Sequence, residues 1–274
     1  MNKIKLIAFD LDGTFLADDK SIPAENISAL KYANSRGVIC VPATGRLFCG
    51  LPEELVQLDF IRYFMLINGC RVYDRAEDRD IYTAEIPLEL ALELYRYADT
   101  IPCIYDCYID NMGRMSRSMY DNMDGFFPDH SYLKLVRKLR TPVDDLKTSL
   151  AAEGKSLQKM QLFFKDLDER QRQLEILPDL FPDLIFSTSL SSNVEINYKT
   201  AGKGKALRAI CKRTGISIEE TLAFGDGTND IEMIDMSGIG AVMENGDEAT
   251  KSHANMIAPN NNSAGVAQII YDMV

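Results

Sequence analysis

The stretch IAFDLDGTFL, residues 7–16, places two acidic residues, Asp10 and Asp12, directly after an apolar run. Short apolar runs are typical of buried β-strands, and a carboxylate is costly to bury unless it is paired or binds a metal ion. At this spacing one carboxylate can act as a nucleophile and the other can donate and accept a proton. By itself, D-x-D-G is often only a turn after a strand, because Asp and Gly both favour turns.

Two more polar clusters follow apolar runs elsewhere in the chain. PATGR, residues 42–46, and FGDGTND, residues 224–230, contribute Thr44, Gly45, Arg46, Asp226, Asn229 and Asp230. Parallel strands joined by helices bring their carboxyl ends to one edge of a sheet. We therefore expect the three clusters to converge at that edge.

Converging carboxylates favour a bound cation, because two like charges ~4 Å apart repel by about 4 kcal/mol at an effective dielectric of 20. The acids concerned are Asp10, Asp12, Asp226 and Asp230. A few oxygen ligands favour Mg²⁺ with several waters over Zn²⁺ or a caged Ca²⁺. The two histidines, His130 and His253, are far apart in the sequence, and DLDGTFLADDKS lacks the Gly and Glu that an EF-hand loop requires.

A magnesium ion near a lysine and a threonine suits phosphoryl transfer, in which positioning and neutralising phosphate oxygens supply most of the catalysis. The lysine-rich stretch KTAGKGKAL, residues 199–207, could supply the lysine. Such a charge run is more usually the solvated start of a helix.

Apolar runs alternate with amphipathic patterns at both ends of the chain. Strands are predicted over residues 4–9, 38–41, 63–67, 222–224, 239–243 and 256–258, and helices over 23–36, 52–58, 203–214, 230–236 and 264–273. This alternation predicts an α/β fold with a doubly wound, Rossmann-like parallel sheet.

The middle of the chain has a different pattern, with helices predicted over residues 88–98 and 168–177 and strands over 104–109, 161–164 and 184–188. We therefore predict a core domain of residues 1–84 and 191–274 and an inserted α+β cap domain of residues 85–190. An inserted domain of this kind can close over a site as a lid.

Composition restricts the partners of the protein. The chain has 274 residues and a net charge of −11, which disfavours nucleic acid and anionic lipid. No run approaches the ~18 apolar residues of a membrane helix, and the first apolar run is too short for a signal peptide, so we expect a cytoplasmic protein without a membrane partner.

Cys103 and Cys107 are interpreted as core residues rather than as a metal or redox pair. The sequence carries no signal of the oligomeric state.

In combination and order, DLDGT, ATGR, GKGKAL and FGDGTNDIEM resemble the four signature motifs of the haloacid dehalogenase (HAD) superfamily, most closely its Cof-type phosphatase branch with a type IIB cap. INGCRVYD and GIGAVMENGDEAT also resemble that branch. The likeness covers nearly the whole chain and places the inserted cap between the second and third motifs. It implies a Mg²⁺-dependent phosphatase that hydrolyses a small phosphorylated metabolite, such as a sugar phosphate, through an aspartyl-phosphate intermediate.

The resemblance also implies a role for each motif residue. Asp10 would be the nucleophile, and Asp12 would be the general acid and base. Lys203 would hold the nucleophile and the phosphate oxygens. Asp226 would bind Mg²⁺ together with the Asp10 carboxylate and the Asp12 main-chain carbonyl, and Asp230 would orient metal-bound water.

The remaining motif residues would surround the phosphate. Thr44 and Gly45 would bind it, and Asn229 would contact either the phosphate or the metal shell. Arg46 would face the cap or the substrate, with an exposed salt bridge as the alternative.

Two stretches depart from the family pattern. The turn MENGD, residues 243–247, replaces a Gly-Asn-Ala-like turn, and we expect its acids, Glu244 and Asp247, to disfavour highly anionic substrates. Ala201-Gly202 replaces the usual Val-Ser before Lys203, which we expect to alter only local packing.

Two other functions are compatible with the same motifs. A phosphomutase returns the phosphoryl group to a reoriented intermediate, and a non-catalytic binding protein could retain the fold. Asp12 favours hydrolysis, because superfamily ATPases have Thr at that position and keep the aspartyl-phosphate longer. Substrate choice is expected to lie in the cap, where residues 110–130 offer Arg114, Arg117 and Tyr120, although a solvated loop over an ordinary core is the commoner interpretation of such a stretch.

Overall fold

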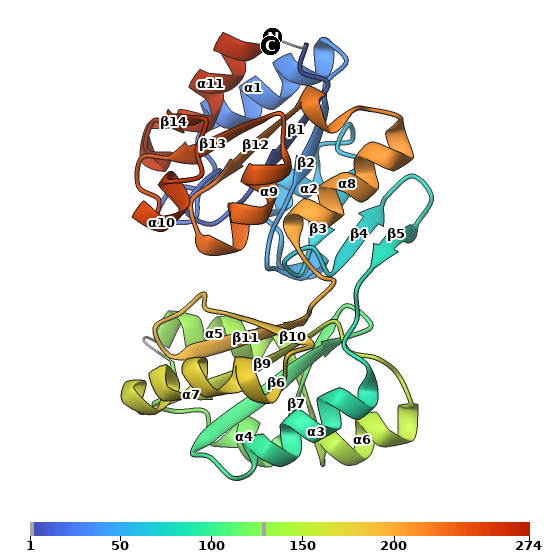
Figure 1. The fold of residues 1–274 in the computed structure, drawn as a ribbon, viewed down its shortest axis with the longest axis vertical. Coiled ribbons are helices and arrows are strands. Elements are labelled where there is room, and N and C mark those ends of the chain that lie inside the picture. Colours follow the sequence, from blue (N-terminus) through green and yellow to red (C-terminus); the bar gives the residue numbers. More distant parts are fainter. Residues whose placement is uncertain (1–2, 128–129) are drawn as a thin grey trace. The chain divides into compact units, whose positions relative to one another are not determined.

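A computed structural model describes residues 3–127 and 130–274, which form two compact units (Figure 1). The first unit runs to Thr83 and continues over Thr200–Val274, and the second comprises Ala84–Lys199. The predicted insertion, residues 85–190, ends too early, because the strand Asn193–Tyr198 pairs with strands of the second unit. The polar residues just before this strand resemble a domain boundary in the sequence but belong to a turn within the unit.

The first unit is built on a five-stranded sheet with the order β14-β13-β12-β1-β2, in which every neighbouring pair is parallel. The strands are β1 (Leu6–Phe9), β2 (Ile39–Pro42), β12 (Thr221–Gly225), β13 (Ile239–Met243) and β14 (Met256–Ala258). The predicted doubly wound parallel sheet is confirmed. The carboxyl ends of β12, β1 and β2 are therefore neighbours along one edge.

Helices cover both faces of this sheet. They are α1 (Ala24–Ser35), α2 (Glu53–Val56), α8 (Lys203–Thr214), α9 (Ile231–Met236), α10 (Glu248–Lys251) and α11 (Gly265–Met273). Leu6 and Ala8 of β1 share a buried cluster with residues of α8 and α9. On the other face the Cys40 thiol lies 3.8 Å from the Leu30 oxygen of α1, and α1 packs against α11. Because both faces are covered, the strands are apolar throughout rather than alternating.

The strand predicted over residues 63–67 belongs to a different sheet. β3 (Tyr63–Leu66) pairs antiparallel with β4 (Arg71–Asp74), which pairs with β5 (Arg79–Thr83). An isolated bridge between Ala43 and Met65 links β3 to the end of β2. An Asn-Gly hairpin signal follows β3 in the sequence, but the apolar periodicity alone indicates another parallel strand.

The second unit contains a six-stranded sheet with the order β10-β11-β9-β6-β7-β8, antiparallel except between β7 and β8. Its strands are β6 (Cys103–Ile109), β7 (Met112–Ser116), β8 (Arg140–Val143), β9 (Lys159–Phe164), β10 (Leu184–Ser187) and β11 (Asn193–Tyr198). Its helices are α3 (Leu88–Ala98), α4 (Arg117–Asp121), α5 (His130–Leu139), α6 (Leu146–Glu153) and α7 (Leu167–Leu180). This is the expected α+β arrangement. No helix in the described part of the chain has both the length and the apolarity to cross a membrane.

The two cysteines of β6 are core residues, as expected. Cys107 is buried and Cys103 is partly buried, and both are free. Burial raises the pKa of each thiol to about 12. Neither is therefore a ready thiolate ligand or redox group.

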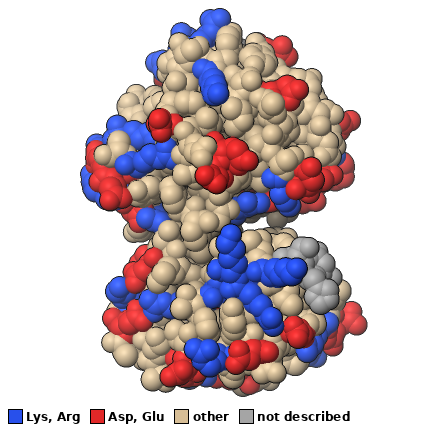
Figure 2. Space-filling model, turned by 180° about the vertical axis from the view of Figure 1, so that it is seen from behind, with Lys and Arg blue, Asp and Glu red and all other residues tan. Residues whose placement is uncertain are grey.

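The polar side chains of residues 110–127 make contacts within the second unit. Arg114 and Arg117 each face an acidic side chain, and the Tyr120 hydroxyl donates to the main-chain oxygen of Arg137 at 3.1 Å. Figure 2 shows Lys and Arg side chains gathered on one face of this unit, so the acidic excess of the chain is not spread evenly. Residues 128–129 of the predicted specificity stretch lie outside the described residues.

The buried side chain of Asn26 joins three segments of the first unit. Its Nδ2 donates to the Phe15 oxygen at 2.9 Å, and its Oδ1 accepts from the Ala267 nitrogen at 3.1 Å. Phe15 lies in the loop that begins with Asp10. Asn26 therefore ties that loop to α1 and α11.

Asn26→Ala leaves the buried Phe15 oxygen without this donor and leaves the Ala267 nitrogen only its bond to the Ala264 oxygen, so we expect it to lower the free energy of unfolding by about 1–3 kcal/mol. Urea denaturation followed by circular dichroism measures this change. Asn34→Ala, at an exposed position of the same helix, is the matched control and should change the free energy by no more than ~0.5 kcal/mol. Equal effects of the two substitutions would contradict the role given to Asn26.

Candidate active site

The ends of three neighbouring strands position the residues of the first, second and fourth motifs. The Asp10 nitrogen donates to the Phe224 oxygen at 3.0 Å, and the Ala43 nitrogen donates to the Phe9 oxygen at 2.8 Å. These bonds extend the parallel ladders by one residue beyond each strand. Asp10, Thr44 and Asp226 consequently follow adjacent strands at the same edge of the sheet.

Lys203, the first residue of α8, lies beside two of the carboxylates. Its Nζ donates to Asp10 Oδ1 at 2.5 Å and to Asp230 Oδ1 at 2.6 Å. Lys203 and Asp230 are 0% exposed and Asp10 is 5% exposed. Breaking a buried pair is costly because the remaining charge is uncompensated. Lys203 therefore holds the Asp10 carboxylate in place.

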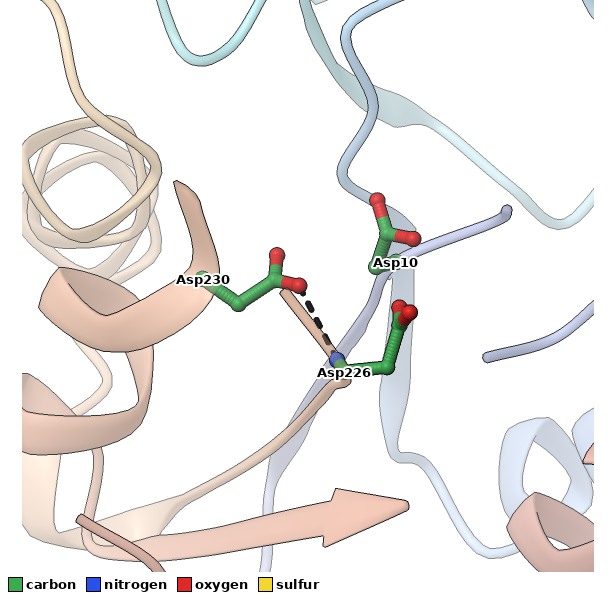
Figure 3. Close-up of side chains that lie close together, drawn as sticks. All are labelled: Asp10, Asp226 and Asp230. Carbon is green, nitrogen blue, oxygen red and sulfur yellow. Dashed lines mark hydrogen bonds between the residues drawn. The ribbon is translucent and has the colours of Figure 1, made fainter. Parts of the chain in front are cut away.

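Asp10, Asp226 and Asp230 form a compact carboxylate cluster (Figure 3), with one oxygen of each within 4.8 Å of the others. The Thr14 hydroxyl donates to Asp226 Oδ1 at 2.8 Å. The main-chain nitrogens of Asp226 and Gly227 each donate to Asp230 Oδ2 at 3.1 Å. Three carboxylates around one lysine leave an excess of negative charge, and an oxygen-only donor set of this kind fits a hard divalent cation.

The buried position of this cluster changes its ionisation. Burial raises the pKa of Asp10 well above its usual range; Lys203 opposes this rise, while Asp230 and Asp226 add to it. Burial and the charge of Asp230 raise the pKa of Asp226 to about 6. Burial alone would lower the pKa of Lys203, but Asp10 and Asp230 outweigh it and raise that pKa. A cation among the carboxylates would lower their pKa values, so metal binding would release protons.

The glycine of DLDGT makes room for the cluster. Gly13 has a φ of +81°, and a Cβ at this position would lie 2.3 Å from Asp226 Oδ2. Any larger residue would displace the Asp226 carboxylate and would also be strained in the left-handed region. Gly13 thus allows the loop after β1 to approach the loop after β12.

Asp12 lies outside the cluster and faces two cations. Arg46 donates to it with Nε at 2.8 Å and with Nη2 at 2.7 Å, and the Lys20 Nζ lies 2.9 Å from Oδ1. Burial would raise the pKa of Asp12, but the hydrogen bond and charge of Arg46, together with Lys20, lower it. Of the alternatives for Arg46, the structure therefore shows a two-armed salt bridge to Asp12. Neither Lys20 nor this pairing is evident from the motifs.

The loop after β2 lies next to a residue that the sequence analysis did not single out. Thr44 is buried, and its hydroxyl accepts from the Arg46 nitrogen at 3.2 Å. The Asn229 Nδ2 donates to Asn68 Oδ1 at 3.3 Å, and a Cβ on Gly45 would lie 2.8 Å from that same oxygen. Asn68 thus joins the second and fourth motifs. Its only signal in the sequence is the Asn-Gly pair of INGCRVYD.

Two residues of the unusual turn MENGD, Asn245 and Asp247, contact the loops that carry the site. The Asp247 nitrogen donates to the Asp226 oxygen at 2.9 Å, and the charge of Asp247 contributes to the raised pKa of Asp226. Asn245 Nδ2 donates to the Gly13 oxygen at 2.7 Å. Glu244 is exposed. Of the two acids in this turn, Asp247 is therefore the one that acts on the carboxylate cluster.

Comparison with known proteins places this geometry in a family. The model of the haloacid dehalogenase-like hydrolases matches residues 7–270. A haloacid dehalogenase-like hydrolase from Bacteroides thetaiotaomicron has the same fold, with a TM-score of 0.81 and 24% identity over 99% of this chain and 100% of that chain. The HAD subclass IIB sugar phosphatase BT4131 also has this fold, with a TM-score of 0.81 and 20% identity over 98% and 100% of the two chains.

Two relatives whose names specify a substrate match over nearly their whole length. The 5-amino-6-(5-phospho-D-ribitylamino)uracil phosphatase YcsE of Bacillus subtilis is 27% identical over 97% of this chain and 94% of its own. The pyridoxal phosphate phosphatase YbhA of Escherichia coli is 25% identical over 97% of both chains. The predicted fold class, the hydrolase class and the likeness to the Cof-type branch are confirmed. This chain belongs to the haloacid dehalogenase-like hydrolases.

Proposed function

We propose that the protein is a Mg²⁺-dependent phosphatase that hydrolyses a small phosphorylated metabolite through an aspartyl-phosphate on Asp10. The observation that carries this proposal is the buried Asp10 carboxylate, held by Lys203 at 2.5 Å beside Asp226 and Asp230. A nucleophile at the end of a packed strand is held with the precision that in-line attack on phosphorus requires.

Asp10 and Asp12 divide the chemistry of the two steps between them. In the first step an Asp10 oxygen attacks phosphorus, the ester P–O bond breaks, and Asp12 gives its proton to the leaving oxygen. In the second step water attacks the phosphorus of the aspartyl-phosphate and Asp12 takes a proton from that water. Inorganic phosphate leaves and the Asp10 carboxylate is restored.

The metal would be held by the Asp10 and Asp226 carboxylates and the Asp12 main-chain carbonyl. When bound, Mg²⁺ supplies positive charge that neutralises the phosphate oxygens. Asp230 suits a supporting position, because one of its oxygens accepts from Lys203 and the other from two main-chain nitrogens. Oxygen donors alone favour Mg²⁺ over softer metals.

The phosphate would be surrounded by Thr44, Gly45 and Asn229, with Lys203 beside the nucleophile. The lowered pKa of Asp12 keeps this carboxylate ionised, which is the form that accepts a proton in the second step. In the first step Asp12 must carry a proton while facing two cations. A dianionic phosphate competes with Asp12 for Arg46 and Lys20, which favours protonation of Asp12 when substrate is present.

The substrate class is supported by the relatives. YcsE and YbhA are named as phosphatases of small phosphorylated metabolites, one a ribitylaminouracil phosphate and the other pyridoxal phosphate. Asp247, which adds negative charge near Asp226, favours a monoester with few further anionic groups. We therefore expect a small phosphomonoester as the substrate.

Asp10→Asn should lower phosphate release by ~10³-fold or more, because an amide replaces the attacking carboxylate. A panel of phosphorylated metabolites with Mg²⁺, ranked by kcat/KM, measures the loss and identifies the substrate. Asp272→Asn, an exposed acid of α11, is the control and should keep the wild-type rate. Equal release by Asp10→Asn and the wild type would refute the nucleophile. Phosphorus NMR on a sugar phosphate separates free phosphate from the isomer that a phosphomutase would form.

The proposed acid role of Asp12 predicts a dependence on the leaving group. Asp12→Asn should lower kcat/KM for an alkyl phosphate by ~10²–10⁴-fold, because the alkoxide needs a proton as it leaves. The loss for p-nitrophenyl phosphate should be much smaller, since nitrophenolate leaves without one. Lys31→Gln, at an exposed position, is the control and should show no loss with either ester. Equal losses for the two esters would argue against the acid role of Asp12.

The raised carboxylate pKa values predict that the effect of Mg²⁺ on stability depends on pH. The pKa of Asp226 is about 6 in the folded protein against 3.8 ordinarily, so metal-free stability should fall as the pH rises through this window. Mg²⁺ binds the ionised carboxylates, and it should therefore raise Tm more at about pH 7.5 than at about pH 5. Differential scanning calorimetry with EDTA or with Mg²⁺ measures both effects.

Asp226→Asn should remove most of this response to Mg²⁺ and raise the Tm of the metal-free protein at about pH 7.5, because one repelling charge is lost. Asp272→Asn serves again as the control and should respond to Mg²⁺ as the wild type does. A shift of the same size at both pH values, or an unchanged response in Asp226→Asn, would exclude this cluster as the metal site.

A further inference from the structure

We propose that Asn68 is a positioning residue of the phosphate site: a left-handed turn directs its side chain onto Asn229 and fixes the orientation of that residue. The inference rests on the proposed phosphatase function. It extends the site to a residue outside the four motifs, in the small antiparallel sheet of the first unit.

The turn after β3 has an uncommon backbone. Ile67, Asn68 and Gly69 have φ angles of +54°, +54° and +78°. Only glycine adopts this region freely; asparagine tolerates it, and a β-branched residue such as isoleucine is a genuine outlier there. The Ile67 side chain is nonetheless fully buried. Strain of this kind persists where the surroundings determine the backbone, and it concentrates at functional sites.

The main chain of this turn contacts the loops of two motifs. The Ile67 nitrogen donates to the Arg46 oxygen at 3.2 Å, and the Asn68 nitrogen donates to the Thr44 oxygen at 3.0 Å. A Cβ on Gly69 would lie 2.3 Å from the Gly202 oxygen, so the start of α8 lies directly against the turn. The turn therefore sets the distance between the Thr44 loop and the helix that begins at Lys203.

The side chain of Asn68 reaches the fourth motif. It is 8% exposed, and its Oδ1 accepts from the Asn229 Nδ2 at 3.3 Å. The other end of the Asn229 amide lies over Gly227, where a Cβ would be 2.9 Å from Asn229 Oδ1. Asn229 is an exposed residue of a short turn, and without this contact its side chain would be free to rotate. Fixing it before the ligand binds avoids the entropy cost of ordering it at that moment.

An ordinary hairpin is the alternative explanation for Asn68, because Asn-Gly is a common pair in tight hairpin turns. In such a turn the asparagine side chain serves only the turn, and glycine replaces it without loss. Here the side chain is buried and bonded to a residue 161 positions away in the sequence. The two explanations therefore make opposite predictions for the activity of Asn68→Gly.

Asn68→Gly keeps the left-handed backbone accessible and removes only the carboxamide. We expect a Tm equal to or above that of the wild type, together with a fall in kcat/KM of about 10-fold or more in which KM rises more than kcat falls. Inorganic phosphate, titrated by calorimetry, should bind more weakly by a similar factor. Asp78→Gly is the matched control, since Asp78 has a φ of +47° in the next turn of the same sheet, and it should leave the kinetics unchanged.

A double-mutant cycle with Asn229→Ala tests the coupling. If Asn68 acts through Asn229, the double variant should lose no more activity and no more phosphate affinity than Asn229→Ala alone. Losses that multiply, near wild-type activity of Asn68→Gly, or failure of that variant to fold would each overturn the proposal. A wild type that releases no phosphate from any ester would defeat the phosphatase function instead, and the phosphate affinities of the same variants would still decide the role of Asn68.

Discussion

The first unit must hold three carboxylates, two buried and one partly buried, close to a single buried lysine, and the ends of its strands are arranged around this cluster. Lys203 offsets part of the charge directly, while the Thr14 hydroxyl and the nitrogens of Asp226 and Gly227 offset more of it by hydrogen bonds. The pKa values of Asp10 and Asp226 remain raised, so this compensation is incomplete. The protein therefore gives up stability at this edge, and a cation would restore it.

Rigid elements hold the charged groups, and small residues let them approach. Asp10 and Asp226 follow central strands of a parallel sheet, and Lys203 begins a helix packed against that sheet. Loops held this way can come close only where no side chain intervenes, which explains Gly13 beside Asp226. The same requirement applies where the turn after β3 meets the start of α8. Close packing of backbone against backbone thus fixes the site more firmly than side-chain contacts alone would.

The parallel sheet could be predicted because β1 and residues 222–224 of β12 are apolar. The helix α8 was predicted at its observed bounds from the inward positions of Leu207, Ile210 and Cys211. Strands whose residues are mixed in polarity were missed. β11 buries Glu195 and Asn197, so hydrophobic periodicity does not mark it and the second unit was ended too early. The motif carboxylates were identified by residue type and spacing. Asn68 and Lys20 were not, because their importance depends on backbone conformation and on partners distant in the sequence.

Asp10 and Asp12 are two residues apart yet lie in opposite environments, and this contrast bears on how the proposed reaction would be controlled. Asp10 faces other carboxylates and has a raised pKa, whereas Asp12 faces Arg46 and Lys20 and has a lowered one. Without ligands, the proposed nucleophile is thus the more easily protonated acid, which is the reverse of what the first step needs. A metal ion would lower the pKa of Asp10, and a phosphate dianion would compete for the cations that hold Asp12 ionised. Metal and substrate together would therefore establish the reactive protonation state: the metal would keep the Asp10 nucleophile ionised, and the substrate would let Asp12 carry the proton that the leaving oxygen needs.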